Sequence, residues 1–443
     1  MKKSLALALL SVAAPACLAA QTPGPAPTPL PVTVLRASRI FDEAGDRVMD
    51  NGVVVIEGSK IKAVGVGLPV PTGATVLDLG DATLLPGFID SHTHITEEAS
   101  DNWLSDFYQG LRRTAPEQTL FGAVYARRTL EAGFTTIRNV GASEDEDIGL
   151  RNGINKGLVP GPRILASRYA LGATGGHCDQ TGFPEHTFGP EPGPERGVFH
   201  GADEGRQAVR LQIKYGADVI KMCASGGVLS LADDVAAPQL TEEELTAVID
   251  EAHRLKRKTA AHSHGDLAAR TAVKAGIDSI EHGSFLSDDT LQLMKAKGTY
   301  LVPTLLAGEY TGGKAAKFPP EIAAKARAAL AARSDMFRRA LKLGVKIAFG
   351  TDSAVSPHGI NAQEFALMVG LGMSPGAALK AAGPAAADLL GLSKEIGTLE
   401  AGKEADMIAV PGNPLVDIHA TEKVLFVMKG GKVFRNDAKG AGR

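Results

Sequence analysis

The sequence predicts an α/β protein that consists of a (β/α)8 barrel (a TIM barrel) and a small β-sandwich domain built from both chain ends. Two patterns support this prediction. In the middle of the chain, helix-like segments end in Gly and a β-branched run such as Phe134-Thr135-Thr136-Ile137 follows at once. Towards both ends, short β-branched runs alternate with turn residues. A Gly directly after a helix supplies the left-handed residue, and the run that follows is the next strand of a parallel sheet.

The barrel is predicted over residues 84–389. One helix between its strands has a clear start, because Thr241 and Glu244 form a capping box ahead of an apolar face. Strands follow helix-ending glycines at five places, and three further apolar runs bring the total to eight. The predicted strands are 84–94, 133–137, 162–167, 216–220, 257–262, 276–280, 298–302 and 344–348. In such a barrel the catalytic groups lie at the C-terminal ends of the strands.

The β-sandwich is predicted from residues 32–83 and 390–436. Both segments contain β-branched runs with turn residues between them, and Glu57-Gly58 is one such hairpin-like break. Neither segment has enough strands to bury a core by itself. We therefore expect the two chain ends to share one small domain.

The composition is that of an ordinary globular protein, with 443 residues, 44 % hydrophobic residues, 22 % charged residues and a net charge of −3. The chain is long enough for a large core and too long for one small domain. It has no excess of basic residues, which argues against nucleic acid and against an anionic membrane surface as partners.

The first 20 residues have the features of a secretory signal peptide, because two lysines precede an apolar run that gives way to small residues. Residues 21–31 are rich in Pro and predict an exposed linker. No other apolar run approaches the length of a membrane span. We therefore expect a periplasmic or secreted protein. Lipid modification of Cys17 is the alternative, which the residues before it disfavour.

Cys178 and Cys223 are the two cysteines that remain after cleavage of the signal peptide. A disulfide between them is one alternative in an oxidising compartment, but nothing in their spacing requires it. We expect two free, partly buried thiols.

The predicted strand at 84–94 ends in His-Thr-His, and His92 and His94 point to the same side because strand side chains alternate faces. Neutral imidazole is a common metal ligand, so the pair predicts half of a metal site; a polar strand end is the alternative. Other predicted strand ends carry residues of the same kind. These residues are Lys221, His262, His264, His282 and Asp352. One such residue is commonplace, whereas the whole set on one barrel is a rare coincidence.

Motifs at these strand ends resemble those of the amidohydrolase superfamily. They are GFIDSHTH at 87–94, VIKMCASGGV at 219–228, AAHSHG at 260–265, SIEHGSF at 279–285 and FGTDSA at 349–354, and the resemblance includes the closing GTLEAGKEADMIAV at 397–410. The resemblance covers nearly the whole mature chain. It is most similar to the branch of binuclear-metal Xaa-Pro dipeptidases, carboxypeptidases that act on C-terminal Arg or Lys, and ochratoxin-hydrolysing amidases.

The resemblance implies two divalent metal ions, with zinc as the expected metal. His92, His94 and Asp352 would hold the more buried ion, and His262 and His282 would hold the second ion. Asp352 would also take a proton from the attacking hydroxide and pass it to the leaving nitrogen.

The resemblance further implies that Lys221 reacts with carbon dioxide to form a carbamate that bridges the two ions. This needs the neutral amine, which an apolar strand end favours by lowering the lysine pKa. His177 lies in a Gly-Gly-His segment that resembles one in which the His faces the substrate carbonyl, although Cys178 stands where Gly is usual. His264 would line the pocket as a substrate contact, with a role as metal ligand as the alternative.

The resemblance predicts an enzyme that hydrolyses the amide bond of a small molecule by a metal-bridging hydroxide, next to a free carboxylate. A dipeptide, an N-acyl amino acid or ochratoxin A would fit. The segments 171–200, 96–115, 228–240 and 305–320 are expected to be loops that set specificity. A mononuclear cyclic-amide hydrolase or deaminase of the same superfamily is the alternative enzyme, although it leaves Lys221 without a role. An exported binding protein that has lost the chemistry is the alternative outside enzymes. The chain is also a candidate homo-oligomer.

Overall fold

The computed structural model of the protein describes residues 30–100, 102–185, 187–231 and 233–438. The predicted signal peptide (1–20) and all but the last two residues of the predicted linker (21–31) lie outside the described residues. Within these described ranges, no helix combines the length and the apolar character that crossing a membrane requires.

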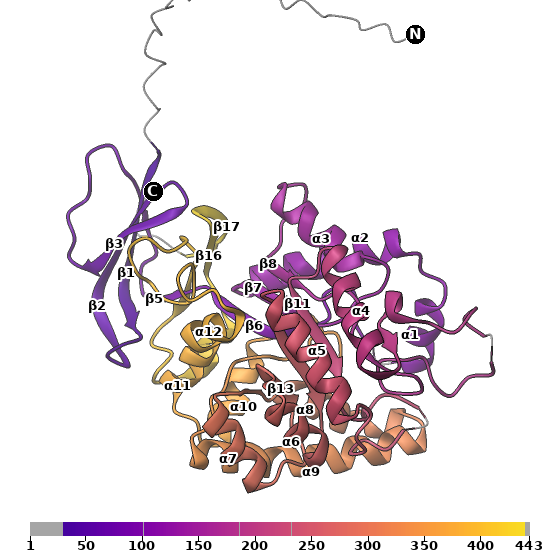
Figure 1. Ribbon diagram of the computed structural model, residues 1–443. Coiled ribbons are helices and arrows are strands. Elements are labelled where there is room, and N and C mark those ends of the chain that lie inside the picture. The colour runs from indigo at the N-terminus through magenta and orange to yellow at the C-terminus, as the bar shows by residue number, and fades with distance from the viewer. Residues whose placement is uncertain (1–29, 101, 186, 232, 439–443) are drawn as a thin grey trace, which may run out of the picture.

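One sheet takes strands from both chain ends, which lie side by side in Figure 1. Its order is β17-β16-β15-β5-β1-β2-β3, and β4 pairs with β1. The bounds are β1 (Val32–Asp42), β2 (Arg47–Glu57), β3 (Lys60–Val66), β4 (Thr75–Asp78), β5 (Ala82–Pro86), β15 (Met407–Pro411), β16 (Phe426–Lys429) and β17 (Lys432–Asn436). The strand pairing thus defines a single sheet, and a sandwich of two layers stays a prediction.

The apolar run predicted as one strand at 84–94 forms two strands that separate at Gly87. Residues before it belong to β5, which pairs with β15, whereas β6 (Phe88–Thr93) pairs with β7 (Phe134–Asn139). A Cβ atom at Gly87 would lie 2.1 Å from Thr135 Oγ1, so only Gly permits this close approach. At Gly87 the chain thus passes from the sheet formed by the two chain ends into the first of the central parallel strands.

The central strands are all parallel and fall into two sheets, β6-β7-β8 and β11-β12-β13-β14. The remaining bounds are β8 (Arg163–Ala166), β11 (Val219–Cys223), β12 (Lys258–Ser263), β13 (Ser279–His282) and β14 (Tyr300–Val302), with a small parallel pair β9 (Gly172–Ala173) and β10 (Val198–Phe199). Isolated parallel bridges link Leu171 to Met222, Leu301 to Ile347 and Thr93 to Ser353. The predicted eighth strand at 344–348 is therefore present only as a bridge at Ile347.

Helices follow the parallel strands and cover them, as Figure 1 shows for α4 and α5 beside β11. The α-helices are α1 (Trp103–Gly110), α2 (Ala115–Glu131), α3 (Glu146–Asn155), α4 (Gly201–Lys214), α5 (Glu242–Arg254), α6 (Asp266–Lys274), α7 (Asp288–Lys297), α8 (Leu305–Gly313), α9 (Pro320–Leu343), α10 (Gln363–Gly370), α11 (Pro375–Lys380) and α12 (Ala386–Leu390). Short 3-10 helices are η1 (Pro194–Arg196), η2 (Ala315–Lys317) and η4 (Ile418–Glu422), and η3 (Ala381–Ala385) is a π-helix. The capping box predicted for α5 from Thr241 and Glu244 is confirmed.

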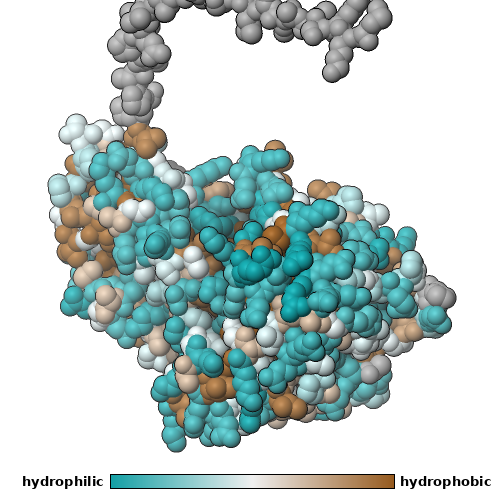
Figure 2. All heavy atoms as spheres, viewed as in Figure 1, coloured by the Kyte–Doolittle hydropathy of each residue, from teal (hydrophilic) through white to brown (hydrophobic). Residues whose placement is uncertain are grey.

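The main core lies between the parallel strands and their helices, and aromatic side chains fill it below the site. Phe88 contacts Phe134 and Phe365 with ring centroids 5.5 and 4.8 Å apart, and Phe349 lies 4.4 Å from Phe365. Such packing contributes hydrophobic burial and fixed geometry together. Hydrophilic residues cover most of the face in Figure 2, with apolar residues showing in patches.

Candidate metal centre

The sequence-predicted residues at the strand ends come together at one end of the parallel strands. His92 lies in β6, Lys221 in β11, His262 in β12, and His282 is the last residue of β13. Of the remaining members, His94 follows directly after β6 and His264 directly after β12, whereas Asp352 lies five residues after the bridge at Ile347. Parallel strands place their C-terminal ends at the same edge, which is why residues so far apart in sequence converge here.

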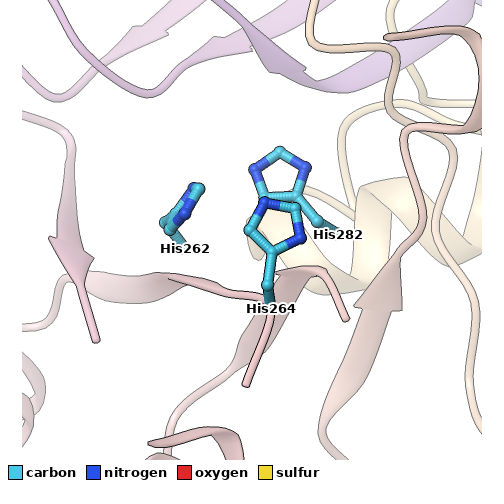
Figure 3. Close-up of side chains that lie close together, drawn as sticks. All are labelled: His262, His264 and His282. Atoms are coloured by element: carbon cyan, nitrogen blue, oxygen red, sulfur yellow. The ribbon is translucent and has the colours of Figure 1, made fainter. Parts of the chain in front are cut away.

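Two overlapping groups of side chains bring their ligand atoms within 4.8 Å of one another: His262, His264 and His282 form one, and His92, His282 and Asp352 form the other. Figure 3 shows the rings of the first group, with His264 and His282 overlapping and His262 facing them across a short gap. The His264 and His282 rings are stacked with centroids 5.0 Å apart. Geometry thus places His264 as close to the cluster as the two predicted ligands.

Asp352 lies between the two histidines of the first strand end. Its Oδ1 is 3.4 Å from His92 Nε2 and 3.5 Å from His94 Nε2. Burial raises the carboxyl pKa, but the two histidines and Lys221 more than offset this, so the pKa of Asp352 lies well below its usual range. Asp352 is therefore a carboxylate, a group with the chemistry to bind a cation through oxygen or to accept a proton.

The ring nitrogens of His92 have distinct partners. Nδ1 is 2.7 Å from Glu281 Oε2, and Glu281 Oε1 accepts a hydrogen bond of 2.9 Å from Arg138. Burial raises the pKa of Glu281, but Arg138 and His92 lower it to about 2. A carboxylate that accepts from Nδ1–H leaves Nε2 as the acceptor that faces Asp352.

The other histidines are also oriented through the nitrogen that points away from the cluster. His94 Nδ1 contacts Gly141 O at 3.2 Å, and His262 Nε2 contacts Gly226 O at 3.1 Å. Because a carbonyl oxygen only accepts, each ring donates there and keeps its other nitrogen as an acceptor. These outer partners are the kind that fix metal-ligating imidazoles.

His264 and His282 are linked through one buried guanidinium. His264 Nδ1 lies 2.8 Å from Ser284 Oγ and His282 Nδ1 lies 2.7 Å from Thr304 Oγ1. Arg333, on α9, donates from Nε to Ser284 Oγ at 3.4 Å and from one terminal nitrogen to Thr304 O at 2.7 Å. One side chain on a distant helix thus supports the partners of both histidines.

Burial sets the protonation of the basic groups. It lowers the pKa of His94 and of His177 to about 4, and it lowers the pKa of His262, His264 and His282 well below the usual range. Lys221 is 3 % exposed, and burial lowers its pKa to about 8 against the pull of Glu281 and Asp352. The five histidines with a lowered pKa are therefore neutral imidazoles at pH 7, and the lysine has an accessible neutral form.

Strained backbone accompanies these side chains. His282, Thr304 and Asp352 have positive φ angles of 69°, 48° and 59°. Non-glycine residues adopt this region at a cost of about 1–3 kcal/mol, and such residues cluster at functional sites. The strain aims His282 and Asp352 into the same space.

His177 also reaches the cluster, from the segment between β9 and β10. Its ring lies 4.2 Å from the His262 ring, and its backbone N–H donates to Gln239 Oε1 at 2.8 Å. The structure thus brings His177 beside a predicted ligand.

The prediction of free thiols is wrong, because Cys178 and Cys223 form a disulfide with Cα atoms 5.8 Å apart. The two residues are 45 positions apart. The bridge between Leu171 and Met222 carries the segment past the end of β11 and brings Cys178 to Cys223. This pairing depends on the tertiary structure and leaves no trace in the cysteine spacing.

Sequence reasoning missed the outer partners. Glu281 precedes His282 in a buried strand, and Arg138 is the penultimate residue of the buried strand β7, so a charged residue inside a buried strand was the available signal. No comparable signal marks Ser284, Thr304 or Arg333.

The parallel strands and the helices between them define an α/β protein. A cluster of His, Lys and Asp side chains lies at the strand ends, where such folds hold their active sites, and forms a candidate metal centre. Residues 83–434 match the model of the amidohydrolase family. The chain belongs to the amidohydrolase family.

Curated and solved relatives agree with this assignment. Ochratoxinase of Aspergillus niger is 35 % identical over 433 residues, covering 92 % of this chain and 88 % of the relative. A solved structure of a Xaa-Pro dipeptidase with methionine bound in its active site is 38 % identical with a TM-score of 0.88, over 91 % of this chain and 100 % of that chain. A prolidase in complex with N-methylphosphonate-L-proline is 29 % identical with a TM-score of 0.82, over 91 % and 100 %. The chain thus has the TIM-barrel fold of this family and is a hydrolase.

Proposed function

We propose that this protein hydrolyses an amide bond next to a free carboxylate in a small molecule, such as a dipeptide or an N-acyl amino acid, with ochratoxin A as one candidate. The observation that carries the proposal is the convergence of five histidines, Lys221 and Asp352 at the strand ends. Similarity to an ochratoxinase and to a Xaa-Pro dipeptidase supports the substrate class.

The residues fit two divalent cations, because neutral imidazoles and an ionised carboxylate are the donors that zinc prefers. His92, His94 and Asp352 would hold one ion, and His262 and His282 the other. When bound, the ions would lower the pKa of a water molecule and polarise the scissile carbonyl.

Lys221 would act between the two ion positions as a carbamate. The neutral Nζ would attack the carbon of carbon dioxide, so that a C–N bond forms, one C–O π bond opens to give a carboxylate oxygen, and one proton leaves the nitrogen for water. Burial supports this step, because a pKa of about 8 makes the neutral amine far more accessible than in an exposed lysine. This role is the reason to prefer a binuclear site over a mononuclear cyclic-amide hydrolase or deaminase, in which Lys221 would be idle.

The chain's own groups would move the protons and bind the carbonyl oxygen. Asp352 would accept the proton of the attacking water at Oδ1 and pass it to the leaving nitrogen. His177, neutral at pH 7, would donate a ring N–H to the oxygen on which negative charge develops. His264 would line the substrate pocket beside His282.

We also propose that the protein is exported and works in the periplasm or outside the cell. The disulfide between Cys178 and Cys223 supports this location, because disulfides persist mainly in oxidising compartments.

The bridges at Leu171, Ile347 and Ser353 support a closed arrangement in which the segment at 344–348 is the eighth barrel strand.

The function is tested by metal analysis of the mature protein together with a hydrolysis screen of Xaa-Pro and Xaa-Arg dipeptides, N-acyl-Phe and ochratoxin A. We expect about two divalent metal ions per chain, because the donors divide into two sets, and release of an amino acid that is quantified directly. One ion or none, with every amide intact, would contradict the proposal and favour the cyclic-amide reaction.

Metal loading should depend on pH through Lys221. The pKa of Lys221 is about 8, so below that pH the fraction of neutral amine rises roughly tenfold for each unit by which the pH increases. Metal-free protein given zinc under a constant partial pressure of carbon dioxide should therefore gain activity faster as the pH rises from 6.5 to 8, and little faster beyond it. Reactivation that is equally fast at all these pH values would contradict carbamate formation on Lys221.

Arg333→Met should weaken the site without touching a proposed ligand. The substitution removes the donors to Ser284 and Thr304, so His264 and His282 lose their fixed orientation, and outer-partner losses of this kind cost about 10–100-fold in metal affinity or activity. Chelator competition measures the affinity. Arg339→Met, on the same helix and paired with Asp335, is the control and should retain full affinity.

A further inference from the structure

Within the described ranges, no hydrogen bond to Nδ1 orients the ring of His177. Nδ1 is buried and has no partner among the residues that the structure describes. The other histidines of the cluster, in contrast, each have an outer partner, as His92 has in Glu281. The position of the His177 ring must therefore come from the backbone that carries it and from the walls around it.

Two links fix that backbone. On one side, His177 N–H donates to Gln239, whose amide donates in turn to Asp233 at 3.1 Å. On the other side, the disulfide ties the very next residue, Cys178, to Cys223 at the end of β11. Cys223 lies two residues after Lys221 on the same strand, so the disulfide connects the His177 backbone to the strand of the proposed bridging lysine.

The segment needs such a link because its regular pairing with β11 ends early. Leu171 N–H donates to Lys221 O, and Cys223 N–H donates to Leu171 O, both at 2.8 Å. After the short strand β9 the chain leaves the sheet and turns through Gly175, with a φ of 73°. The disulfide links Cys178, which follows this turn, to Cys223 at the end of β11.

Glycines shape the walls around the two linked residues. A Cβ atom at Gly227 would lie 2.1 Å from His177 Nδ1, and one at Gly172 would lie 2.7 Å from Cys178 Cβ. The His262 ring closes another side at 4.2 Å. The His177 ring therefore fits closely between Gly227 and the His262 ring. A shift of the His177 backbone by a fraction of an ångström would bring the ring into a clash with one of them.

We propose that the Cys178–Cys223 disulfide is a positioning element for the reaction, which holds His177 at a fixed place relative to Lys221 and His262. This inference rests on the proposed function, in which His177 donates to the carbonyl oxygen. Reduction cleaves the S–S bond and yields two thiols by uptake of two electrons and two protons. The tether is then lost, while every proposed metal ligand stays in place. Turnover should fall and metal content should not.

The test compares oxidised protein, protein reduced with a phosphine, and the variants Cys178→Ser and Cys223→Ser. The phosphine supplies the two electrons and becomes a phosphine oxide with oxygen from water, and unlike a dithiol it does not offer a pair of thiolates to zinc. Denatured mature protein should show no free thiol before reduction and two afterwards. We expect kcat to fall about tenfold or more, with KM changed much less and two metal ions retained, because misplaced groups cost rate more than binding. Reoxidation should restore kcat.

A His177→Ala background separates positioning from general destabilisation. If the disulfide acts through His177, its reduction should leave the lowered kcat of His177→Ala unchanged, so the two losses do not add. Additive losses would overturn the proposal, as would full activity of the reduced protein and of both serine variants.

Amide hydrogen exchange over residues 174–180 tests whether the disulfide holds this segment without measuring turnover. Exchange there should become faster on reduction, and unchanged exchange would show that the disulfide does not hold the segment. Faster exchange in a protein whose oxidised form cleaves no amide would confirm the tether and contradict the proposed function alone. Faster exchange with unchanged kcat would overturn the positioning role.

Discussion

Lys221→Ala should lose more than about 100-fold in kcat/KM and retain at most one metal ion per chain. Substitutions of outer partners already cost about 10–100-fold, and Lys221 would contact both ions itself. Its buried amine also has no replacement among the charged groups that act on it, because Glu281 and Asp352 are acids and the guanidinium of Arg138 donates to Glu281. Metal analysis of the purified variant and steady-state kinetics on the best substrate of the screen measure both effects.

Lys346→Ala is the matched control for this prediction. Lys346 belongs to the segment that bridges to β14, but its side chain is 53 % exposed, and its contacts are Asp388 at 3.6 Å and the Tyr300 ring, whose centroid lies 4.9 Å from the amine. Its loss should change neither metal content nor kcat/KM. If Lys221→Ala keeps full activity and two ions while its fold is intact, the binuclear site is wrong.

Most of the candidate site residues could be predicted from the sequence because they lie at the ends of strands that local patterns mark, whereas His177, in the segment between β9 and β10, was found only through the resemblance. Alternation places His92 and His94 on one face, and parallel strands bring His262 and His282 to the same edge. The outer partners escape this logic. Arg333 lies in a helix whose own pattern concerns packing, and only the tertiary structure shows that its guanidinium reaches Ser284 and Thr304.

The segment at 305–320 shows the same limit for secondary structure. It was expected to be a loop, but residues Leu305–Gly313 form α8. The helix has no side-chain cap from its preceding residue, Thr304, and instead Glu364 accepts from the N–H groups of Leu305 and Leu306 at 2.9 and 2.6 Å. A carboxyl group that accepts from the first N–H groups caps the helix, although burial raises the pKa of Glu364 to about 8, and this cap comes from 58 residues away. No local sequence pattern contains that information.

Asp352→Asn should separate the two roles proposed for this residue. Asparagine keeps the shape and one oxygen donor, but it cannot take up a proton at Oδ1. Loss of a general base costs about 100- to 10,000-fold in rate, so kcat should fall in that range. The ion beside His92 and His94 should be retained better than in Asp352→Ala, which removes the oxygen as well. Metal content and kcat are measured on both variants.

Asp335→Asn is the control, because Asp335 is 70 % exposed at its side chain and pairs only with Arg339 among the ion pairs of the described residues. It should leave kcat unchanged. Equal metal loss in Asp352→Asn and Asp352→Ala would show that Asp352 acts mainly as a ligand. Full kcat in Asp352→Asn would show that another group takes the proton. Since the pKa of Asp352 lies far below neutral, its protonation should not limit the wild-type rate at pH 6 to 8, and an acid limb of the kcat/KM profile in that range must come from another group.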